Sequence, residues 1–319
     1  MSASTHHTAA AAVAKGSTPH PLIVTQRVSK RFGSVRAVAE LSLEVEAGEI
    51  VGFLGPNGAG KTTTIRMLMG FISPSSGRCS VFGASLRDRW DLRRRVGYLP
   101  GDFRMDPSMC GRDLFQWFGR LRGGVNQSRV DDLTERLQLD PTRPFGALSK
   151  GNRQKIGIVQ AFMNDPEVLI LDEPTTGLDP LVQRDFLELV RACAANGAAV
   201  LFSSHVLPEV ERLASRVAII RAGRLVTVAT IDQLAEHARH RLELRFANPV
   251  PHDLFVGVPG VVAQQVDGRS VVITLDGPAG PAMEVAAKGP GLIRVSSAGD
   301  DLEDLFLKFY EGPPESTHA

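Results

Sequence analysis

Short, continuous apolar runs alternate with helix-compatible stretches along most of the chain. Four of these runs are Ile50–Leu54, Val168–Leu171, Ala198–Phe202 and Val217–Ile220. Apolar runs of this length, separated by helical segments, are typical of strands buried on both faces of a parallel sheet. The pattern therefore predicts an α/β fold, with packed structure beginning near Leu22–Val28.

The pattern departs from this alternation in two places. Between about Gly111 and Ala147 it is helical, and Asp113–Leu121 is rich in apolar side chains, which predicts a helical subdomain over about 103–165. Beyond about residue 231, alternating residues and a terminal amphipathic stretch predict a small α+β domain. The alternating residues are Leu242, Leu244 and Phe246, and Val271–Leu275 is a further strand candidate. The terminal amphipathic stretch, Asp301–Tyr310, is predicted to be a helix.

These observations predict how the chain is divided. We expect a disordered tail over residues 1–20, a main α/β domain over 21–234, an accessory domain over 235–312 and a second tail over 313–319. The first tail consists mainly of small and polar residues and is rich in alanine, a composition that cannot bury enough apolar surface to fold.

Composition excludes several classes of function. The 319 residues carry a net charge of +1, so no overall field would draw the chain onto nucleic acid or an anionic membrane. Its three cysteines, Cys79, Cys110 and Cys193, are too far apart to suggest a disulfide framework or a zinc site. No apolar stretch has the roughly 18 residues of a membrane helix, and Ala9–Ala14 is too short for a signal peptide.

A phosphate-binding loop follows the first predicted buried strand. The run Gly55-Pro56-Asn57-Gly58-Ala59-Gly60-Lys61-Thr62 matches G-x-x-x-x-G-K-[ST] and precedes a helix-compatible stretch. Its backbone N–H groups and the helix N-terminus would surround phosphate oxygens. We expect Lys61 to reach the β- and γ-phosphates of ATP, Thr62 to ligate Mg²⁺, and Thr63 to contact a further phosphate oxygen.

Two acids end another predicted strand, at Asp172 and Glu173. Carboxylates at the end of a buried strand are costly unless a cation or a bound water requires them. Asp172 would hold Mg²⁺ through water, and Glu173 would act as the general base that polarises the attacking water. The alternative, a pair of solvated turn acids, is disfavoured by the phosphate loop upstream.

Three more motifs follow the phosphate loop in a fixed order around these acids. They are Leu148-Ser149-Lys150-Gly151-Asn152, Thr175-Thr176-Gly177-Leu178-Asp179-Pro180 and Ser203-Ser204-His205. The whole set, from about Leu22 to Leu234, resembles the ATP-binding cassettes of ABC transporters. This resemblance implies a P-loop NTPase fold with a helical subdomain, and an ATPase that works as a homodimer.

The resemblance also implies the roles of individual residues. The signature consists of Ser149, Lys150, Gly151 and Asn152. Ser149 and Gly151 would contact the γ-phosphate held by the opposite subunit, because a helix N-terminus presents free N–H groups to anions. Asp179 would communicate across the subunit interface. His205 would hydrogen-bond the γ-phosphate and orient the water; a purely structural histidine is the alternative.

Phe32 matches the aromatic residue that stacks on adenine in this family. Such stacking contributes about 1–3 kcal/mol in comparable nucleic-acid sites. A position in the core is the alternative interpretation. Two interpretations are also open for four aromatic residues of the helical subdomain. In this family the subdomain receives a short helix of the membrane partner, and these residues either line that groove or belong to the helix core. They are Phe103, Phe115, Trp117 and Phe118.

The chain departs from the family pattern at three positions. Lys150 and Asn152 stand where glycine and glutamine are usual, but both keep a polar helix start. The larger departure is Gly101, where the family has glutamine or glutamate that links Mg²⁺ to the helical subdomain. Either Asp102 takes that place or water does.

The sequence thus predicts the ATP-hydrolysing subunit of an ABC transporter, with ATP and Mg²⁺ bound, at the cytoplasmic face of the membrane. The accessory domain and the Tyr98–Asp102 and Ser149–Gln154 variants resemble the ABC-2 export group, which implies drug, antibiotic or lipid-like cargo and a separate polytopic permease. A soluble ABC ATPase with a non-transport role is the alternative. The cargo is carried by another polypeptide, so this sequence does not identify it.

Overall fold

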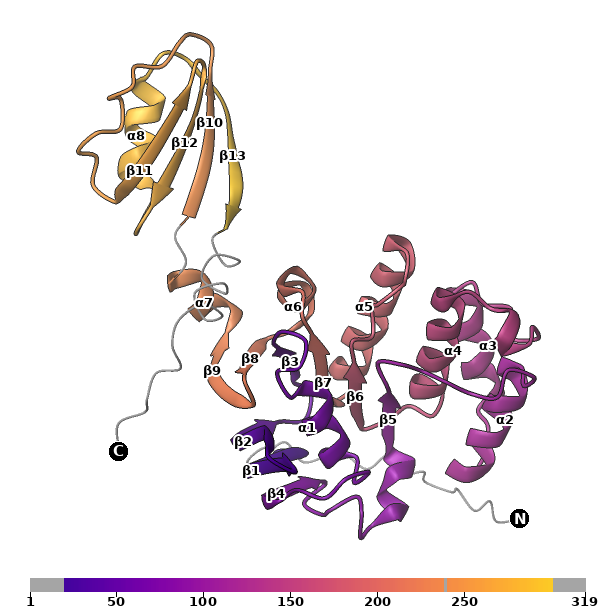
Figure 1. Cartoon of the computed structure of the whole chain (residues 1–319). Helices are drawn as coiled ribbons and strands as arrows, with labels where there is room; N and C mark the ends of the chain where they lie inside the picture. Colours follow the sequence, from indigo (N-terminus) through magenta and orange to yellow (C-terminus); the bar gives the residue numbers. More distant parts are fainter. Residues whose placement is uncertain (1–19, 238–239, 301–319) are drawn as a thin grey trace, which may run out of the picture.

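The computed structural model describes residues 20–237 and 240–300 (Figure 1). Its strands in chain order are β1 (Ile23–Phe32), β2 (Val35–Val45), β3 (Ile50–Leu54), β4 (Ser76–Val81), β5 (Val96–Leu99), β6 (Val168–Asp172), β7 (Ala199–Ser204), β8 (Arg216–Arg221), β9 (Arg224–Thr230), β10 (His240–Phe246), β11 (Val261–Asp267), β12 (Ser270–Leu275) and β13 (Leu292–Asp300). The helices are α1 (Lys61–Leu68), α2 (Gly111–Arg122), α3 (Gln127–Arg136), α4 (Lys150–Phe162), α5 (Pro180–Ala195), α6 (Leu207–Leu213), α7 (Ile231–His237) and α8 (Gly280–Lys288), with short 3₁₀ helices at Trp90–Arg95 and Phe145–Ala147. The helix predicted at Asp301–Tyr310 lies outside the described residues.

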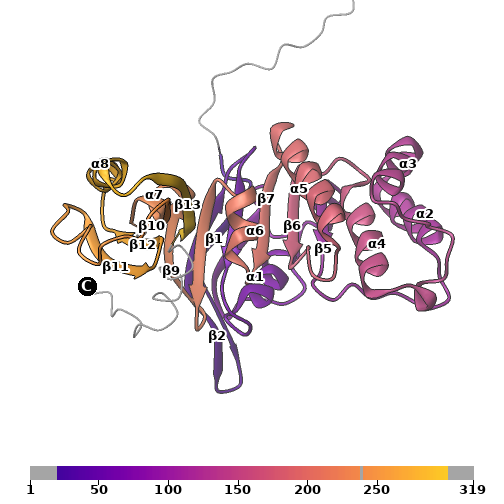
Figure 2. The same cartoon turned by 90° about the horizontal axis from the view of Figure 1, so that it is seen from above.

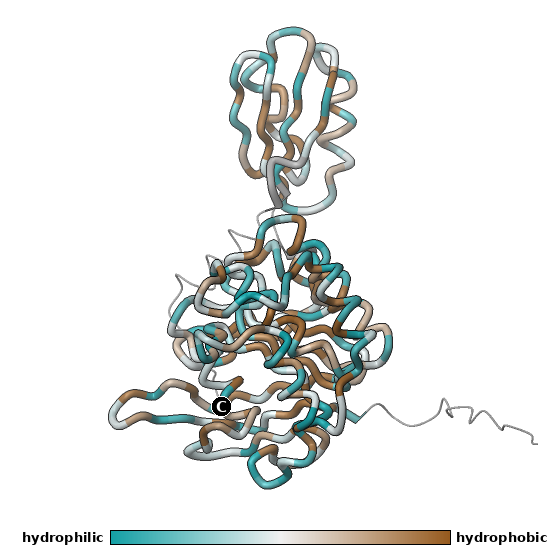
Figure 3. Tube along the Cα trace, turned by 90° about the vertical axis from the view of Figure 1, so that its right-hand side faces the viewer, coloured by the Kyte–Doolittle hydropathy of each residue, from teal (hydrophilic) through white to brown (hydrophobic). Residues whose placement is uncertain are grey.

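A six-stranded sheet with the order β5-β6-β7-β3-β8-β9 forms the centre of the main domain. All neighbours are parallel except β9, which pairs antiparallel with β8. The four predicted strands are confirmed, and every residue of β3, β6 and β7 is buried. Apolar side chains from alternate positions of these strands enter two separate cores, one on each face of the sheet. Figure 3 shows the hydrophobic stretches running through the middle of this domain.

The strand order brings the carboxyl ends of β3, β6 and β7 side by side. Ser203 on β7 lies opposite both Phe53 on β3 and Asp172 on β6, and Ser204 lies opposite Leu54. Ligands of open parallel sheets bind outside the carboxyl ends of the strands. The sheet therefore places the phosphate loop, the two acids and the Ser203–His205 segment together at the carboxyl ends of its strands.

A second sheet, β2-β1-β4, is antiparallel and packs on one of the two cores. Sequence patterning located only its beginning, near Leu22–Val28. The reason lies in β1, whose pairing with β2 shifts register three times between Thr25 and Arg31. Each bulge interrupts the two-residue alternation on which strand prediction depends.

The predicted helical segment contains α2 and α3, and the signature opens α4. Figure 2 shows these three helices together beyond the β5 edge of the central sheet. Phe115 is buried in their core, Phe103 and Phe118 are half-buried, and Trp117 is 52% exposed. The core interpretation thus holds for Phe115, while Trp117 contributes to the surface.

The accessory domain is a four-stranded antiparallel sheet with the order β11-β12-β10-β13 and one described helix, α8, as an α+β fold requires. Its alternating residues Leu244 and Phe246 are buried, together with Phe255 and residues of β12 and α8. This core is separate from the two cores of the main domain. The α/β class with an additional α+β domain is therefore confirmed.

Candidate functional site

The phosphate loop connects β3 to α1, as the motif predicts. Gly58 and Gly60 have φ values of 81° and 109°, which favour glycine. A Cβ atom on Gly55 would lie 2.4 Å from the Ile220 carbonyl oxygen, so this glycine is needed for close packing of the loop against β8. Ala59 is buried, Pro56 is half-buried and Asn57 is exposed. The loop is therefore fixed at its base and open at its rim.

Lys61 is the first residue of α1, and its side chain extends back across the phosphate loop. Its Nζ donates hydrogen bonds to the carbonyl oxygens of Gly55 (2.5 Å) and Pro56 (3.2 Å). Burial lowers the pKa of Lys61, while attraction to Glu173 and Asp172 acts in the opposite direction. In the same helical turn, Thr62 is exposed and Thr63 is half-buried. The loop thus presents a buried cation beside a helix N-terminus, which suits a polyphosphate.

The two acids are held by Ser203 on the neighbouring strand. The Ser203 hydroxyl donates a hydrogen bond to Asp172 Oδ1 (2.6 Å) and accepts one from the backbone N–H of Glu173 (3.0 Å). Glu173 has a φ of 46°, a left-handed conformation that costs a non-glycine residue about 1–2 kcal/mol. Residues in such conformations cluster at functional sites, where the surrounding structure holds them.

The three predicted catalytic side chains meet at the Glu173 carboxylate. Lys61 Nζ lies 3.5 Å from Glu173 Oε1, and His205 Nδ1 lies 3.5 Å from Glu173 Oε2. Lys61 is buried, whereas the His205 side chain is 45% exposed. An anion seated on the phosphate loop would therefore have a cation at its base and a carboxylate and an imidazole at its outer side.

The signature residues form the start of α4 and contact the Gly177 turn. Ser149 is the N-cap of α4, and its hydroxyl accepts a hydrogen bond from the Asn152 N–H (3.3 Å). Asn152 thus takes part in the cap through its backbone. A Cβ atom built on Gly151 would lie 2.7 Å from the Gly177 carbonyl oxygen. A Cβ atom built on Gly177 would lie 3.4–3.7 Å from the aliphatic carbons of the Lys150 side chain. The helix start is therefore polar and closely packed, despite its departures from the family pattern.

Asp179 occupies the corresponding position at the start of α5. Its carboxylate accepts a hydrogen bond from the Val182 N–H (3.0 Å), and this contact lowers the pKa of Asp179. Within the described part of the chain, no hydrogen bond or ion pair joins Ser149, Gly151 or Asp179 to the phosphate loop. The signature is accordingly not part of the same cluster as Lys61 and Glu173.

Phe32 lies at the end of β1 with 51% of its surface exposed, and the Lys30 ammonium is 5.0 Å from the centre of its ring. The core interpretation of this residue is therefore wrong. An exposed ring remains available for stacking on a base.

Gly101 lies directly beside Asp172. A Cβ built on Gly101 would be 3.3 Å from the Asp172 carbonyl oxygen and 3.6 Å from Oδ2, so the position faces the acid as the family pattern implies. Asp102 is instead exposed and forms an ion pair with Arg104 (2.6 Å). Within the described residues, no hydrogen bond or ion pair joins Asp102 to Asp172, and the replacement of the family's side chain by Asp102 or by water stays a prediction.

Sequence patterning missed two residues of this region, Ser203 and Glu209. Ser203 lies in the quoted Ser203-Ser204-His205 motif, yet only the structure shows that its hydroxyl contacts both acids. Glu209 lies in the first turn of α6 and accepts hydrogen bonds from Thr175 and Ser204. Its spacing of four residues from His205, just inside a helix, is the only sequence signal that could have located it.

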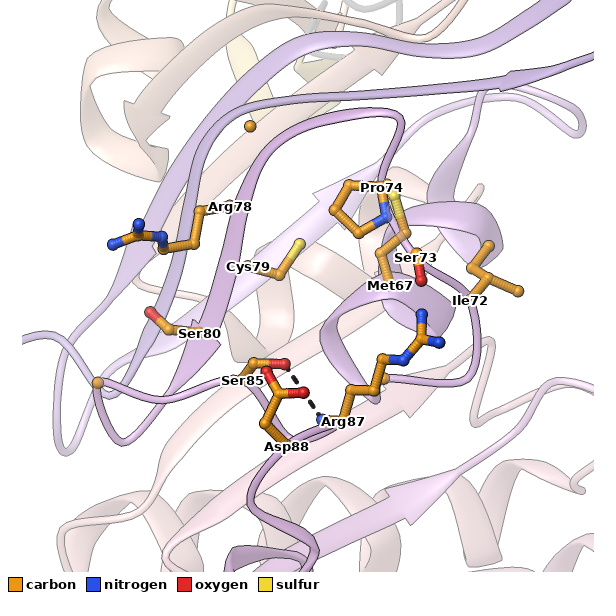
Figure 4. A pocket seen from close by; sticks show the side chains of 13 residues that line it. Met67, Ile72, Ser73, Pro74, Arg78, Cys79, Ser80, Ser85, Arg87 and Asp88 are labelled. Carbon is orange, nitrogen blue, oxygen red and sulfur yellow. Dashed lines mark hydrogen bonds between the residues drawn. The ribbon is translucent and has the colours of Figure 1, made fainter.

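A hollow of about 380 Å³ lies elsewhere, between β4, the end of α1 and the segment 83–88. Figure 4 shows Cys79, Met67 and Pro74 around it, with Arg87 and Asp88 at one side. Burial raises the pKa of the Cys79 thiol to about 12, which makes it unreactive at neutral pH. The hollow shares no lining residue with the phosphate loop, so it is not part of the candidate site.

Residues 20–237 and 240–300 contain neither a membrane-spanning helix nor a metal-binding cluster. In that part of the chain, no helix combines the length and apolar character needed to cross a bilayer. The same residues contain no cluster of three or more histidine, cysteine, aspartate or glutamate side chains that could hold a metal ion.

Comparison with known proteins gives concordant results. Residues 38–176 match the family model described as "ABC transporter". The chain is 33% identical to the bacitracin transport ATP-binding protein BcrA of Bacillus licheniformis, covering 91% of this chain and 98% of that protein. It is 33% identical to the daunorubicin resistance ATP-binding protein DrrA3 of Streptomyces coeruleorubidus, over 90% of this chain and 92% of that one. A solved ATP-binding subunit of an ABC transporter superposes with a TM-score of 0.64 at 30% identity, covering 67% of this chain and 91% of the other.

Proposed function

Because this chain belongs to the ABC transporter family, as an ATP-binding and ATP-hydrolysing subunit, we propose that two copies close head to tail around two Mg·ATP and drive export through a separate membrane subunit. The observation that carries the proposal is the arrangement of the site. Lys61, Glu173 and His205 converge, while the signature start of α4 lies apart from them. A second copy would supply the missing side.

In the proposed reaction, each side chain acts on the γ-phosphate or on the attacking water. Lys61 stabilises negative charge on the β- and γ-phosphates from the base of the loop. Glu173 accepts a proton from the water, and His205, beside the same carboxylate, orients that water and hydrogen-bonds the γ-phosphate. A correctly placed general base contributes about 10²–10⁴ in rate.

The residues present fit a magnesium ion. Asp172 and Thr62 offer hard oxygen ligands, and Mg²⁺ bound to nucleotides commonly takes one or two protein oxygens and several waters. Asp172 Oδ1 is engaged by Ser203, so Oδ2, which faces Gly101, is the oxygen that would act through water. Bound there, the ion would neutralise charge on the phosphates.

The partner copy would close the site with the start of its α4. Ser149 and Gly151 would direct the N–H groups of that helix at the γ-phosphate, and Lys150 and Asn152 would complete this polar surface. Asp179 would communicate between the two copies across their interface. Phe32 would stack on the adenine. Closure on ATP and opening after hydrolysis would then move the membrane subunit.

Export is the direction favoured by the relatives. BcrA is named for bacitracin transport and DrrA3 for daunorubicin resistance, so we propose a drug, antibiotic or lipid-like cargo. The subunit would then be peripheral, on the cytoplasmic face of the membrane. Co-purification with a polytopic membrane protein would support this assignment, whereas a soluble complex alone would favour a non-transport ABC ATPase.

The Glu173→Gln variant tests the proposed chemistry. The amide keeps the shape of the side chain but cannot accept the proton, so turnover should fall roughly 10²–10⁴-fold. The variant should still bind ATP and form an ATP-dependent dimer, measured by light scattering with size-exclusion chromatography. Turnover at the native rate would refute the base assignment.

A further inference from the structure

Glu209 connects the two segments that carry Glu173 and His205. Its Oε1 accepts a hydrogen bond from the Thr175 hydroxyl (2.7 Å), and its Oε2 accepts one from the Ser204 hydroxyl (2.7 Å). Thr175 lies two residues after Glu173, and Ser204 directly precedes His205. One carboxylate therefore ties the turn that follows the base to the turn that holds the histidine.

The surroundings make these contacts firm. Thr175 and Ser204 are buried, and Glu209 is half-buried in the first turn of α6. Hydrogen bonds to an ionised acceptor are about twice as strong as neutral ones. The Ser204 hydroxyl also accepts a hydrogen bond from the Val206 N–H (3.0 Å), which fixes the backbone on the other side of His205.

The two segments need such a connection. Glu173 has a left-handed backbone that its neighbours must hold, and Ser203 fixes its backbone N–H but forms no hydrogen bond with its side chain. The Glu173 side chain meets His205 at 3.5 Å, a spacing that depends on two different loops. A misplacement of about 1 Å at a reacting group costs on the order of 10²-fold in rate.

We propose that Glu209 is a positioning residue for hydrolysis: by bridging Thr175 and Ser204, it sets the distance between Glu173 and His205. Glu209 does not touch the nucleotide in this scheme, and the inference rests on the proposed roles of Glu173 and His205. The Glu209 bridge, meaning Thr175, Glu209 and Ser204, acts on kcat rather than on ATP binding.

The test uses the full-length chain with Glu209→Ala, and Glu135→Ala, at an exposed position of α3 in the same domain, as the matched control. We expect Glu209→Ala to lower kcat roughly 10–100-fold and to leave ATP affinity unchanged. Glu209→Gln keeps one acceptor and one donor at the same positions, so its kcat should fall between those of the alanine variant and the native chain. Native kcat in a folded Glu209→Ala protein would overturn the proposal.

A double-mutant cycle with His205→Ala separates positioning from a general loss of structure. If Glu209 acts through His205, adding Glu209→Ala to His205→Ala should lower kcat little further. Fully additive losses would overturn the proposal. Should Glu209→Ala fail to fold, Thr175→Val and Ser204→Ala each remove one donor; both are expected to reduce kcat, and native kcat in both would refute the bridge.

The Glu173→Gln variant distinguishes this proposal from the one on which it rests. Native turnover in Glu173→Gln would remove the base assignment and the bridge together. A slow Glu173→Gln variant beside a fully active Glu209→Ala variant would refute the bridge alone.

Discussion

The main domain and the accessory domain contain the same kinds of secondary structure but differ in what lies at their strand ends. In the main domain, the parallel strands β3, β6 and β7 end side by side. The segments that follow them bring Lys61 and His205 to the Glu173 carboxylate. In the accessory domain, the strands are antiparallel and the buried residues of its described part are all apolar. Strand direction and order therefore gather the catalytic side chains in the main domain, whereas the described part of the accessory domain has no such arrangement.

This contrast predicts that stability and activity can be separated by mutation. The two domains have separate cores, so damage to one need not unfold the other. All three cysteines and both tryptophans lie between residues 79 and 193, in the main domain. Thiol labelling and tryptophan fluorescence therefore report on the main domain alone.

The largest expected effect is on the accessory core. Phe255 is fully buried there, and Phe255→Ala should cost about 3–5 kcal/mol of that domain's stability. ATP turnover should persist, because the catalytic cluster lies in the main domain, which has separate cores. Calorimetry should show the loss of one unfolding transition, with Val256→Ala, at an exposed position, as the control.

Cys79 shows whether the main domain stays intact in that experiment. Burial raises the pKa of its thiol to about 12, so at pH 8 it is protonated and unreactive while folded. We expect no labelling of Cys79 by iodoacetamide in Phe255→Ala. Rapid labelling would mean that the two domains unfold as one unit.

The next effect concerns the phosphate loop. Lys61→Ala removes the buried cation that lies on the Gly55 carbonyl and beside Glu173, and turnover should fall roughly 10²–10³-fold. ATP binding should weaken as well, measured by isothermal titration calorimetry. The thermal midpoint of the accessory domain should be unchanged; a shift there would contradict the separation of the two domains.

A smaller effect is expected on the outer face of the accessory sheet. Arg245 on β10 and Arg294 on β13 are exposed and directly opposite each other, and like charges in this relation are destabilising. Arg294→Glu should raise the stability of this domain by about 0.2–1 kcal/mol, seen as a higher thermal midpoint. Arg269→Glu, in the neighbouring turn, is the charge-matched control and should give less.

The smallest effect is expected at Asp102. It is exposed and paired with Arg104, and such surface pairs contribute little to stability because water and salt screen them. Asp102→Ala should therefore leave the ATPase rate close to native. A large fall in turnover would show that Asp102 replaces the glutamine or glutamate that Gly101 lacks.

The elements predicted best were those with a single strong signal. The runs Ile50–Leu54 and Val168–Leu171 are apolar throughout, and the phosphate loop carries its own spacing, so strand, loop and helix followed in order. The antiparallel strand β1 was only partly found, because its bulges break the alternation of buried and exposed residues.

The site shows the same limit at the level of contacts. Lys61, Glu173 and His205 could each be identified from motifs, but their meeting at 3.5 Å depends on the pairing of β6, β7 and β3, which is a property of the whole sheet. The bridge from Thr175 through Glu209 to Ser204 joins three elements across 34 residues of sequence, so no local pattern specifies it.

The central claim is that each catalytic site is shared between two copies of the chain, and mixing two inactive variants tests it most directly. Lys61→Ala damages the loop side, and Ser149→Ala with Gly151→Ala damages the signature side. Mixed dimers would contain one site with both sides native, so the mixture should recover ATP turnover that neither variant shows alone. A mixture that forms mixed dimers yet stays as inactive as its components would contradict the shared site.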